Sequence, residues 1–159
     1  FDFRNHGFNE TTGELSQEIL INDTINVLQF IDKFFPDDTI IVVGHSMGGS
    51  IATKTVSEVL KNEDKYKSIS DKLSGLIVID VVEGTAMEAL PFMESIVKSR
   101  PTKFDSVEHA IEYMYKTNTI KNLESAKFSV PSLVRKEGNK YVWKTNLLSS
   151  QKHWTGRFI

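Results

Sequence analysis

The residues best suited to chemistry form the run Gly44-His45-Ser46-Met47-Gly48, which reads G-x-S-x-G. This spacing fits a serine on a sharp turn, where side chains two residues to either side would collide and glycine avoids the collision. A serine hydroxyl becomes a good nucleophile only when a base takes its proton and a third group orients that base. A simpler interpretation is a glycine-rich connection that lets a helix pack closely on a sheet.

The segments around this run favour the nucleophile. Thr39–Val43 is β-branched at every position, which predicts a strand buried on both faces, and Ile51–Leu60 reads as a helix. A helix that begins just after Ser46 would aim its free N–H groups and positive dipole end at the serine. The amide of Met47 could then donate to a developing oxyanion.

Asp80 is the natural third group of such a site. It lies within the apolar run 75–82, which predicts another buried strand, and ligands gather at the carboxyl ends of parallel strands. Glu83 is a weaker candidate because it lies beyond the apolar run. Asp80 could instead be an ordinary strand-end or helix-cap carboxylate.

The chain has four histidines, and none is a convincing base. In the expected chain order of serine, acid and histidine, His6 and His45 come too early. His109 lies on the polar side of an amphipathic helix and is most simply a solvated surface residue. His153 has the right order, but no recognisable sheet strand precedes it.

The elements that must position these residues alternate along the chain. Ser16–Phe35 has a helical pattern that Pro36 stops, and the strand, helix and strand described above follow it. This order predicts a parallel sheet with helices on its faces. Residues 1–83 are therefore expected to form a partial α/β core, and residues 84–159 a helical cap or insertion. Within the second part, the pattern predicts helices over residues 86–98, behind Ser106 and after Asn122, and a hairpin within residues 136–146.

Composition limits the function classes. The chain has 159 residues, 40% of them hydrophobic, a net charge of −2 and no cysteine. These values fit one globular domain, argue against a nucleic-acid binder and exclude a cysteine nucleophile or thiolate zinc site. No apolar stretch is long enough to span a membrane, and no signal pattern occurs at Phe1, so we expect a cytoplasmic or nuclear protein.

Three motifs carry a resemblance to a known family. They are DFRNHG at Asp2–Gly7, GHSMGGSIA at Gly44–Ala52 and IDVVEGTAM at Ile79–Met87. Together they resemble the protein phosphatase methylesterases, members of the α/β-hydrolase superfamily, and the third motif is the most specific. Further matches extend the resemblance over essentially the whole chain, at Ser99–Pro101, Ala110–Glu112, Asn122–Ala126 and Trp143.

The resemblance implies a serine carboxylesterase that removes the methyl ester from the C-terminal leucine of the protein phosphatase 2A catalytic subunit. By position, Ser46 matches the family's nucleophile and Asp80 its acid. The family's histidine follows a further strand, beyond Ile159, and His153 falls where the family tends to carry an aromatic residue. The upstream loop that gives the second oxyanion donor would precede Phe1.

The chain is therefore expected to be the central piece of a larger enzyme, inactive by itself, whose partner is the phosphatase and which needs no metal or organic cofactor. Two other functions remain open: a small-molecule esterase or lipase on the same fold, and a non-catalytic binding protein that keeps the scaffold.

Overall fold

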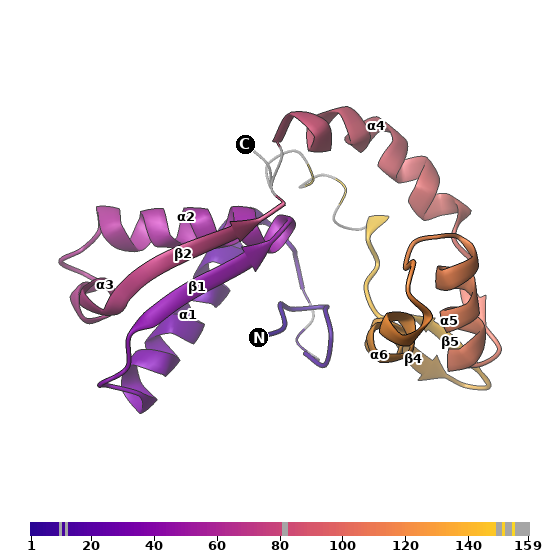
Figure 1. Cartoon of the computed structure of the whole chain (residues 1–159), viewed down its shortest axis with the longest axis horizontal. Coiled ribbons are helices and arrows are strands. Elements are labelled where there is room, and N and C mark those ends of the chain that lie inside the picture. The colour runs from indigo at the N-terminus through magenta and orange to yellow at the C-terminus, as the bar shows by residue number, and fades with distance from the viewer. Residues whose placement is uncertain (10, 12, 81–82, 149–150, 152–153, 155–159) are drawn as a thin grey trace. The chain divides into compact units, whose positions relative to one another are not determined.

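The computed structural model describes residues 1–9, 11, 13–80, 83–148, 151 and 154, and it divides into two compact units. We call Glu14–Met93 with Ser150–Ile159 the elbow unit, and Phe1–Gly13 with Glu94–Ser149 the hairpin unit. Helix α4 (Glu83–Ser99) contributes to both (Figure 1). The division at residue 83 that the sequence suggested stays a prediction.

Helix α1 (Gln17–Phe34) opens the elbow unit within a residue or two of its predicted bounds. The Ser16 hydroxyl accepts a hydrogen bond from the Ile19 N–H at 3.4 Å, which caps one of the free donors of the first turn. Leu20, Ile25 and Leu28 are buried along one side of the helix. The 3.6-residue periodicity of the sequence therefore marks the face that packs on the core.

The sheet of this unit consists of β1 (Ile40–His45) and β2 (Leu73–Ile79), which pair in parallel. Helix α2 (Met47–Lys61) and the short α3 (Lys67–Lys72) form the crossover between them. The sequence pattern did not predict α3, because the residues between the second predicted helix and the run 75–82 are mostly polar. The helix buries only Ile69, so its apolar pattern is too short to read from sequence.

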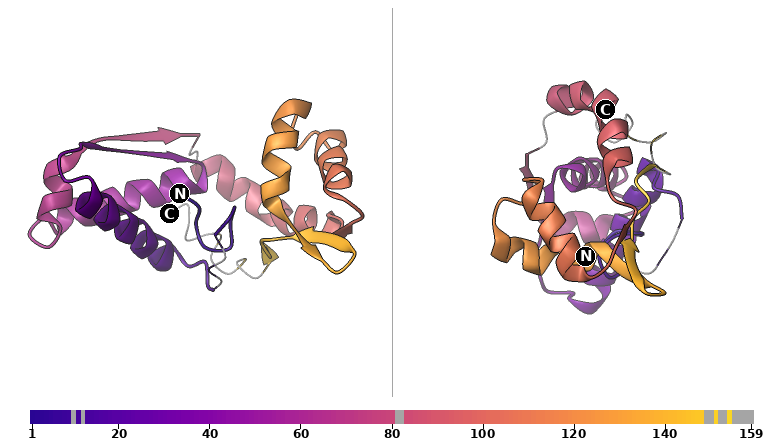
Figure 2. Two further views of the ribbon diagram at one scale, coloured as in Figure 1. Left: turned by 90° about the horizontal axis from the view of Figure 1, so that it is seen from below. Right: turned by 90° about the vertical axis from the view of Figure 1, so that its right-hand side faces the viewer.

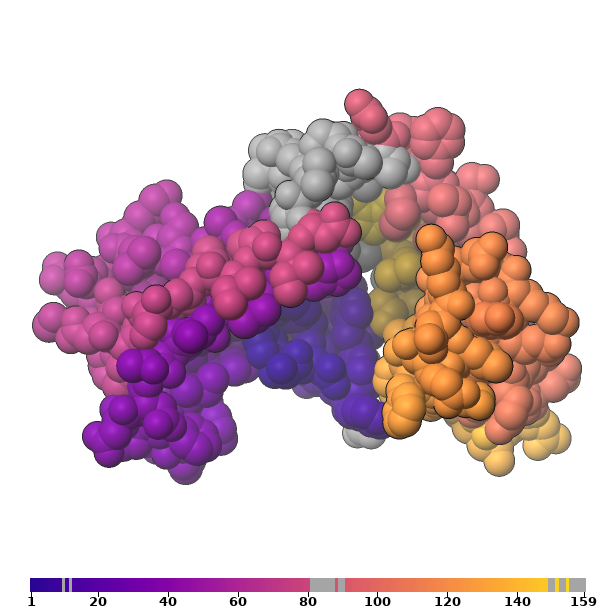
Figure 3. Space-filling model, viewed as in Figure 1, coloured from indigo at the N-terminus to yellow at the C-terminus, as the bar shows by residue number. Residues whose placement is uncertain are grey.

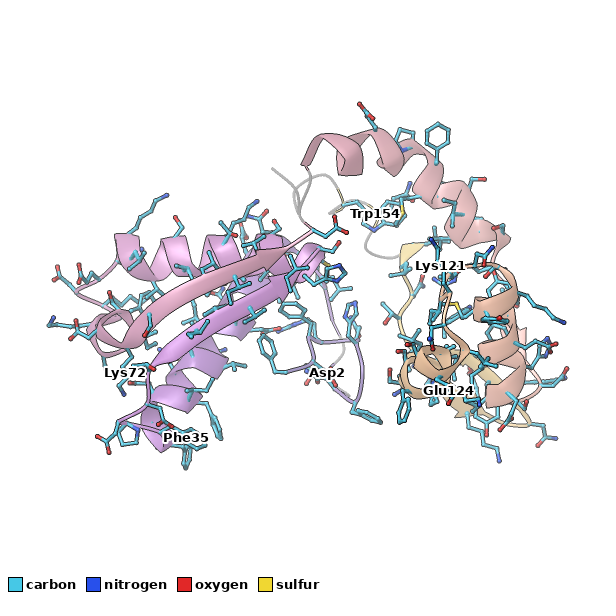
Figure 4. All side chains as sticks on the ribbon, in the orientation of Figure 1. Asp2, Phe35, Lys72, Lys121, Glu124 and Trp154 are labelled. Carbon is cyan, nitrogen blue, oxygen red and sulfur yellow. The ribbon has the colours of Figure 1, made fainter. Side chains whose placement is uncertain are left out.

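Helices α1 and α2 lie on the same face of this sheet (Figure 2, left). Side chains from that face, from both helices and from the segment around α3 form one core, made of Ile25, Leu28, Ile40, Val59, Tyr66 and Ile69. Lys72 of α3, which Figure 4 labels, pairs with the Asp32 carboxylate of α1.

The opposite face of the sheet is open, which contradicts the expectation that both strands are buried on both faces. Ile41, Val43 and Ile77 are 58%, 57% and 50% exposed. The face turns toward the viewer in Figure 3. The β-branched composition suits two-sided burial, but among the described residues of this unit the helices pack on one side only.

The hairpin unit is built on a three-stranded antiparallel sheet in the order β3 (Lys103–Phe104), β5 (Lys140–Trp143) and β4 (Val134–Glu137). The predicted hairpin is confirmed as the pair β4 and β5. Gly138 begins the tight turn between these strands with a φ of +59°, a value that glycine adopts without strain.

Helices α5 (Val107–Lys116) and α6 (Leu123–Leu133) complete the hairpin unit and confirm the helices predicted behind Ser106 and Asn122. Both cap residues act as expected: the Ser106 hydroxyl accepts from the His109 N–H at 3.1 Å and the Asn122 side chain from the Ser125 N–H at 2.9 Å. The core gathers around Phe104, which is 1% exposed.

The N-terminal segment belongs to this unit and is tied to it by polar contacts. Lys144 Nζ donates to the Gly7 carbonyl at 2.7 Å. Within the segment, the carboxylate of Asp2, which Figure 4 labels, accepts from the Phe8 N–H at 2.8 Å. No helix within the described residues combines the length and apolarity that a membrane crossing requires.

Candidate active site

Ser46 occupies a one-residue turn between the last residue of β1 and the first residue of α2. Its φ of +50° and ψ of −122° lie in a region that residues with a Cβ rarely adopt. Hydrogen bonds on both sides hold it there: its N–H donates to the Ile79 carbonyl at 2.9 Å, and its own carbonyl accepts from Gly49 and Ser50 of α2. The strain is therefore maintained by the sheet and by the helix.

The two glycines around Ser46 serve this turn differently. A Cβ built on Gly44 would come within 2.6 Å of the Gly49 Cα and of the Gly48 carbonyl carbon, so glycine is required there. At Gly48 an added Cβ would meet no atom within 4 Å. We expected a collision at both positions, and this is wrong for Gly48. A Cβ on Gly48 would lie in open space, and it is the backbone of Gly48 that a Cβ on Gly44 would strike.

The start of α2 supplies hydrogen-bond donors beside Ser46. Met47 is the first residue of the helix, so its N–H lies outside the helix's own hydrogen-bond ladder. The positive end of the helix dipole lies at the same place. Ser46 is partly exposed, so solvent reaches this turn.

Asp80 follows directly on β2 and has a φ of +51°. The parallel register pairs His45 with Ile79, so Ser46 and Asp80 each lie one residue beyond the same rung of the sheet. The structure thus brings the two predicted site residues to neighbouring strand ends. The Asp80 side chain is 76% exposed.

His45 makes a contact that its position in the sequence did not predict. Its Nε2 lies 3.9 Å from the Asp80 Oδ2, with the His45 side chain 66% exposed. An exposed pair at this distance adds little stability. The signal for it was the strand register: once the two runs are paired at their ends, the residue before Ser46 lies opposite the residue before Asp80.

The other histidines lie elsewhere or outside the described residues. His6 Nδ1 lies 2.8 Å from the Arg4 carbonyl oxygen in the N-terminal segment. His109 is half-exposed with its Nδ1 3.5 Å from an Asp105 carboxylate oxygen, which confirms the surface position predicted for it. His153 lies outside the described residues. Within the described part, no histidine is hydrogen-bonded to the Ser46 hydroxyl, and no three acidic or histidine side chains gather as metal ligands would.

The geometry of a strand, a strained serine turn and a helix agrees with comparisons to known proteins. The model of the family described as "Alpha/beta hydrolase family" matches residues 1–158. The chain belongs to the alpha/beta hydrolase family. Among solved structures, this family member is similar to E-2-(acetamidomethylene)succinate hydrolase, with a TM-score of 0.68 and 14% identity over 97% of this chain and 52% of the other. That likeness shows the fold.

Curated relatives of this alpha/beta hydrolase confirm the resemblance found in its motifs. Protein phosphatase methylesterase 1 of Schizosaccharomyces pombe is 39% identical over 99% of this chain and 45% of the relative. The probable protein phosphatase methylesterase 1 of Caenorhabditis elegans is also 39% identical, over 99% of this chain and 42% of the relative. The chain thus spans less than half the length of these relatives.

Proposed function

We propose that this chain supplies the nucleophile and the acid of a serine carboxylesterase. The observation that carries the proposal is the strained turn of Ser46 between β1 and α2, together with Asp80 at the matching position after the neighbouring strand β2. A serine held in such a turn has its hydroxyl clear of the sheet. The similarity to methylesterases supports the same reaction class.

The reaction follows from these positions. Ser46 Oγ would attack the ester carbonyl carbon while a histidine outside this chain takes the hydroxyl proton and returns it to the departing methoxide, which leaves as methanol. The Met47 N–H would donate to the oxyanion that forms on the carbonyl oxygen. Water then attacks the acyl-serine and releases the carboxylate. Asp80 would hold the histidine in the required tautomer.

The proposed substrate is the methyl ester on the C-terminal leucine carboxylate of the protein phosphatase 2A catalytic subunit. The names of the relatives support a phosphatase substrate, and the three motifs of the sequence support the same family. A methyl ester is activated enough for hydrolysis by a serine, a base and an oxyanion hole.

The deciding experiment measures demethylation of the phosphatase by the complete protein that carries this chain, with Ser46→Ala compared against Ser74→Ala. Ser74 is an exposed serine at the start of β2, so it controls for loss of a hydroxyl. We expect Ser46→Ala to lower kcat by at least about 10³-fold and Ser74→Ala to keep wild-type turnover. Ordinary turnover by Ser46→Ala would refute the assignment.

Two further measurements separate the alternatives. A fluorophosphonate probe that labels the complete wild-type protein but not Ser46→Ala would exclude a non-catalytic binding protein. Equal efficiency on simple esters and on the methylated phosphatase would favour a small-molecule esterase. We also propose that the isolated chain has no turnover. Measurable ester hydrolysis by the isolated chain would favour His153 as the catalytic base.

A further inference from the structure

The hairpin unit has a pocket of about 220 Å³ between the end of α4 and the segment that follows β5. Its lining includes Arg100 and Trp143 together with the apolar side chains of Val97, Leu147 and Leu148. Small-molecule sites usually have about 300–1,000 Å³, so this pocket is sized for one or two side chains. It therefore fits part of a protein ligand better than a whole metabolite.

Arg100 is held in one orientation by Trp143. The guanidinium carbon lies 3.7 Å from the centre of the indole ring, and the indole Nε1 donates to the Pro101 carbonyl at 2.8 Å. Phe104 packs against the same indole with ring centres 5.1 Å apart. Stacking occupies the flat face of a guanidinium and leaves its N–H groups, which lie in the plane, able to grip a carboxylate with two parallel hydrogen bonds.

The charge of Arg100 is uncompensated in the described part of the chain. Several lysines of the hairpin unit have carboxylate partners, such as Lys116 with Glu112 and Lys127 with Glu124 at 2.7 Å. Arg100 is more buried than these lysines and makes no ion pair with a described residue. Burial lowers its pKa, although a guanidinium keeps its charge at neutral pH. Charges removed from water are usually paired in proteins, so a partly desolvated cation without a counter-ion is suited to bind an anion.

We propose that this pocket binds an acidic residue of the protein substrate, with the carboxylate on Arg100 and a neighbouring apolar side chain against Val97 and Leu148. The proposal rests on the proposed function in one respect, that the substrate is a protein. The pocket serves in docking, because Arg100 selects the substrate and takes no part in the chemistry at Ser46.

The main test compares Arg100→Gln with Arg135→Gln in the complete protein. Arg135 is an exposed arginine on β4 of the same unit, so it matches the change in net charge. Steady-state kinetics are measured with the methylated phosphatase and with p-nitrophenyl acetate. We expect Arg100→Gln to raise KM for the phosphatase about 10- to 100-fold, the range of a charge-assisted hydrogen bond, with kcat within about 2-fold and small-ester turnover unchanged. Arg135→Gln should change none of these.

A KM for the phosphatase within about 2-fold of wild type in Arg100→Gln would overturn the docking role. If kcat/KM for p-nitrophenyl acetate fell as much as kcat/KM for the phosphatase, the docking role would also be overturned, because that result indicates a structural role. If circular dichroism shows that Arg100→Gln does not fold, Arg100→Lys decides. It keeps the charge but not the flat stacking, so we expect a KM increase of about 3- to 10-fold, and an unchanged KM refutes the proposal.

A binding measurement makes the result independent of the proposed reaction. Two labelled peptides, Gly-Leu-Glu-Leu-Gly and Gly-Leu-Gln-Leu-Gly with blocked ends, are titrated with the complete protein by fluorescence polarisation. We expect the glutamate peptide to bind at least about 10-fold more tightly, a preference that Arg100→Gln removes and Arg135→Gln retains. Absence of the preference in wild type refutes the pocket, whatever the outcome with Ser46→Ala.

Discussion

The two units differ in where they place unusual backbone and exposed apolar surface. In the elbow unit, positive φ falls on Ser46 and Asp80, and one sheet face is open. Among the described residues of the hairpin unit, the non-glycine residues with positive φ are Asn5 and Asn118, and asparagine tolerates this conformation. The elbow unit therefore places its strained backbone at the two proposed catalytic residues, while the strained positions of the hairpin unit are of a residue type that tolerates them.

The largest expected effects come from emptying the two cores. Phe104→Ala should lower the free energy of unfolding by about 3–5 kcal/mol, because Phe104 is fully buried in the hairpin unit. Ile51→Ala, at 0% exposure in α2, should cost about 2–5 kcal/mol in the elbow unit. Urea unfolding can assign each loss, because the two tryptophans, Trp143 and Trp154, lie in different units.

Phe128→Ala is the control for these losses, since Phe128 is 85% exposed on α6. It should change stability by less than about 0.5 kcal/mol. If each core substitution lowered the urea midpoints reported by both tryptophans equally, the two units would unfold as one. The units would then differ in structure but not in stability.

The next effect tests the strained turn. Gly44→Ala forces a Cβ against the backbone of Gly48 and Gly49, and we expect a cost of about 1–3 kcal/mol or more, together with loss of the proposed esterase activity in the complete protein. Gly48→Ala has open space and lies within α2, so it should keep stability or gain up to about 1 kcal/mol. Equal stability of the two variants, measured by urea unfolding, would contradict the close approach described at Gly44.

A smaller effect compares the helix caps of the two units. Ser106 accepts from the His109 N–H at 3.1 Å, and Ser106→Ala should cost about 1 kcal/mol in the hairpin unit. The bond of Ser16 in the elbow unit is longer, 3.4 Å, so Ser16→Ala should cost about 0.5 kcal/mol. Thermal melts of both variants check the order, and the reverse order would show that cap geometry does not set their strength.

The smallest effect is the dependence of stability on acid pH. Hydrogen bonds from Lys72 and Ser68 lower the pKa of Asp32, and a hydrogen bond from Lys140 lowers the pKa of Asp105. A lowered pKa stabilises the fold above the unfolded value of about 3.9, and this contribution is lost as pH falls through the folded pKa. The Asp32 side chain is 23% exposed and that of Asp105 is 68%, so solvent screens Asp105 more strongly.

Asp32→Asn should therefore flatten the acid side of the stability profile more than Asp105→Asn does. Urea unfolding at several pH values between about 2 and 6 measures both profiles. A larger change in Asp105→Asn would show that burial does not separate the two pairs.

The sequence predicted the long helices and the strands β1 and β2, because these have a helical period or a continuous apolar run. It did not predict β3, which has only two residues and therefore no pattern. It also predicted that Ser46 and Asp80 lie at the carboxyl ends of two successive strands, although it placed Asp80 inside the second strand and the structure ends β2 at Ile79. It missed α3, which buries one residue, and it missed that β1 and β2 are covered on one face, because composition does not reveal which partners are present. The contact between His45 and Asp80 depends on strand register, which no single segment encodes.

The hydrogen bond from the Ser46 N–H to the Ile79 carbonyl crosses from one strand to the next. The offset between the serine and the carboxylate is thus set by the spacing of adjacent strands, about 4.8 Å, and not by the length of chain that joins them. Residues can therefore be inserted between α2 and α3 without moving Ser46 or Asp80. A single residue inserted inside β1 or β2 would instead move Ser46 or Asp80 to the opposite side of the sheet. Changes in chain length are therefore tolerated in the crossover but not within the two strands.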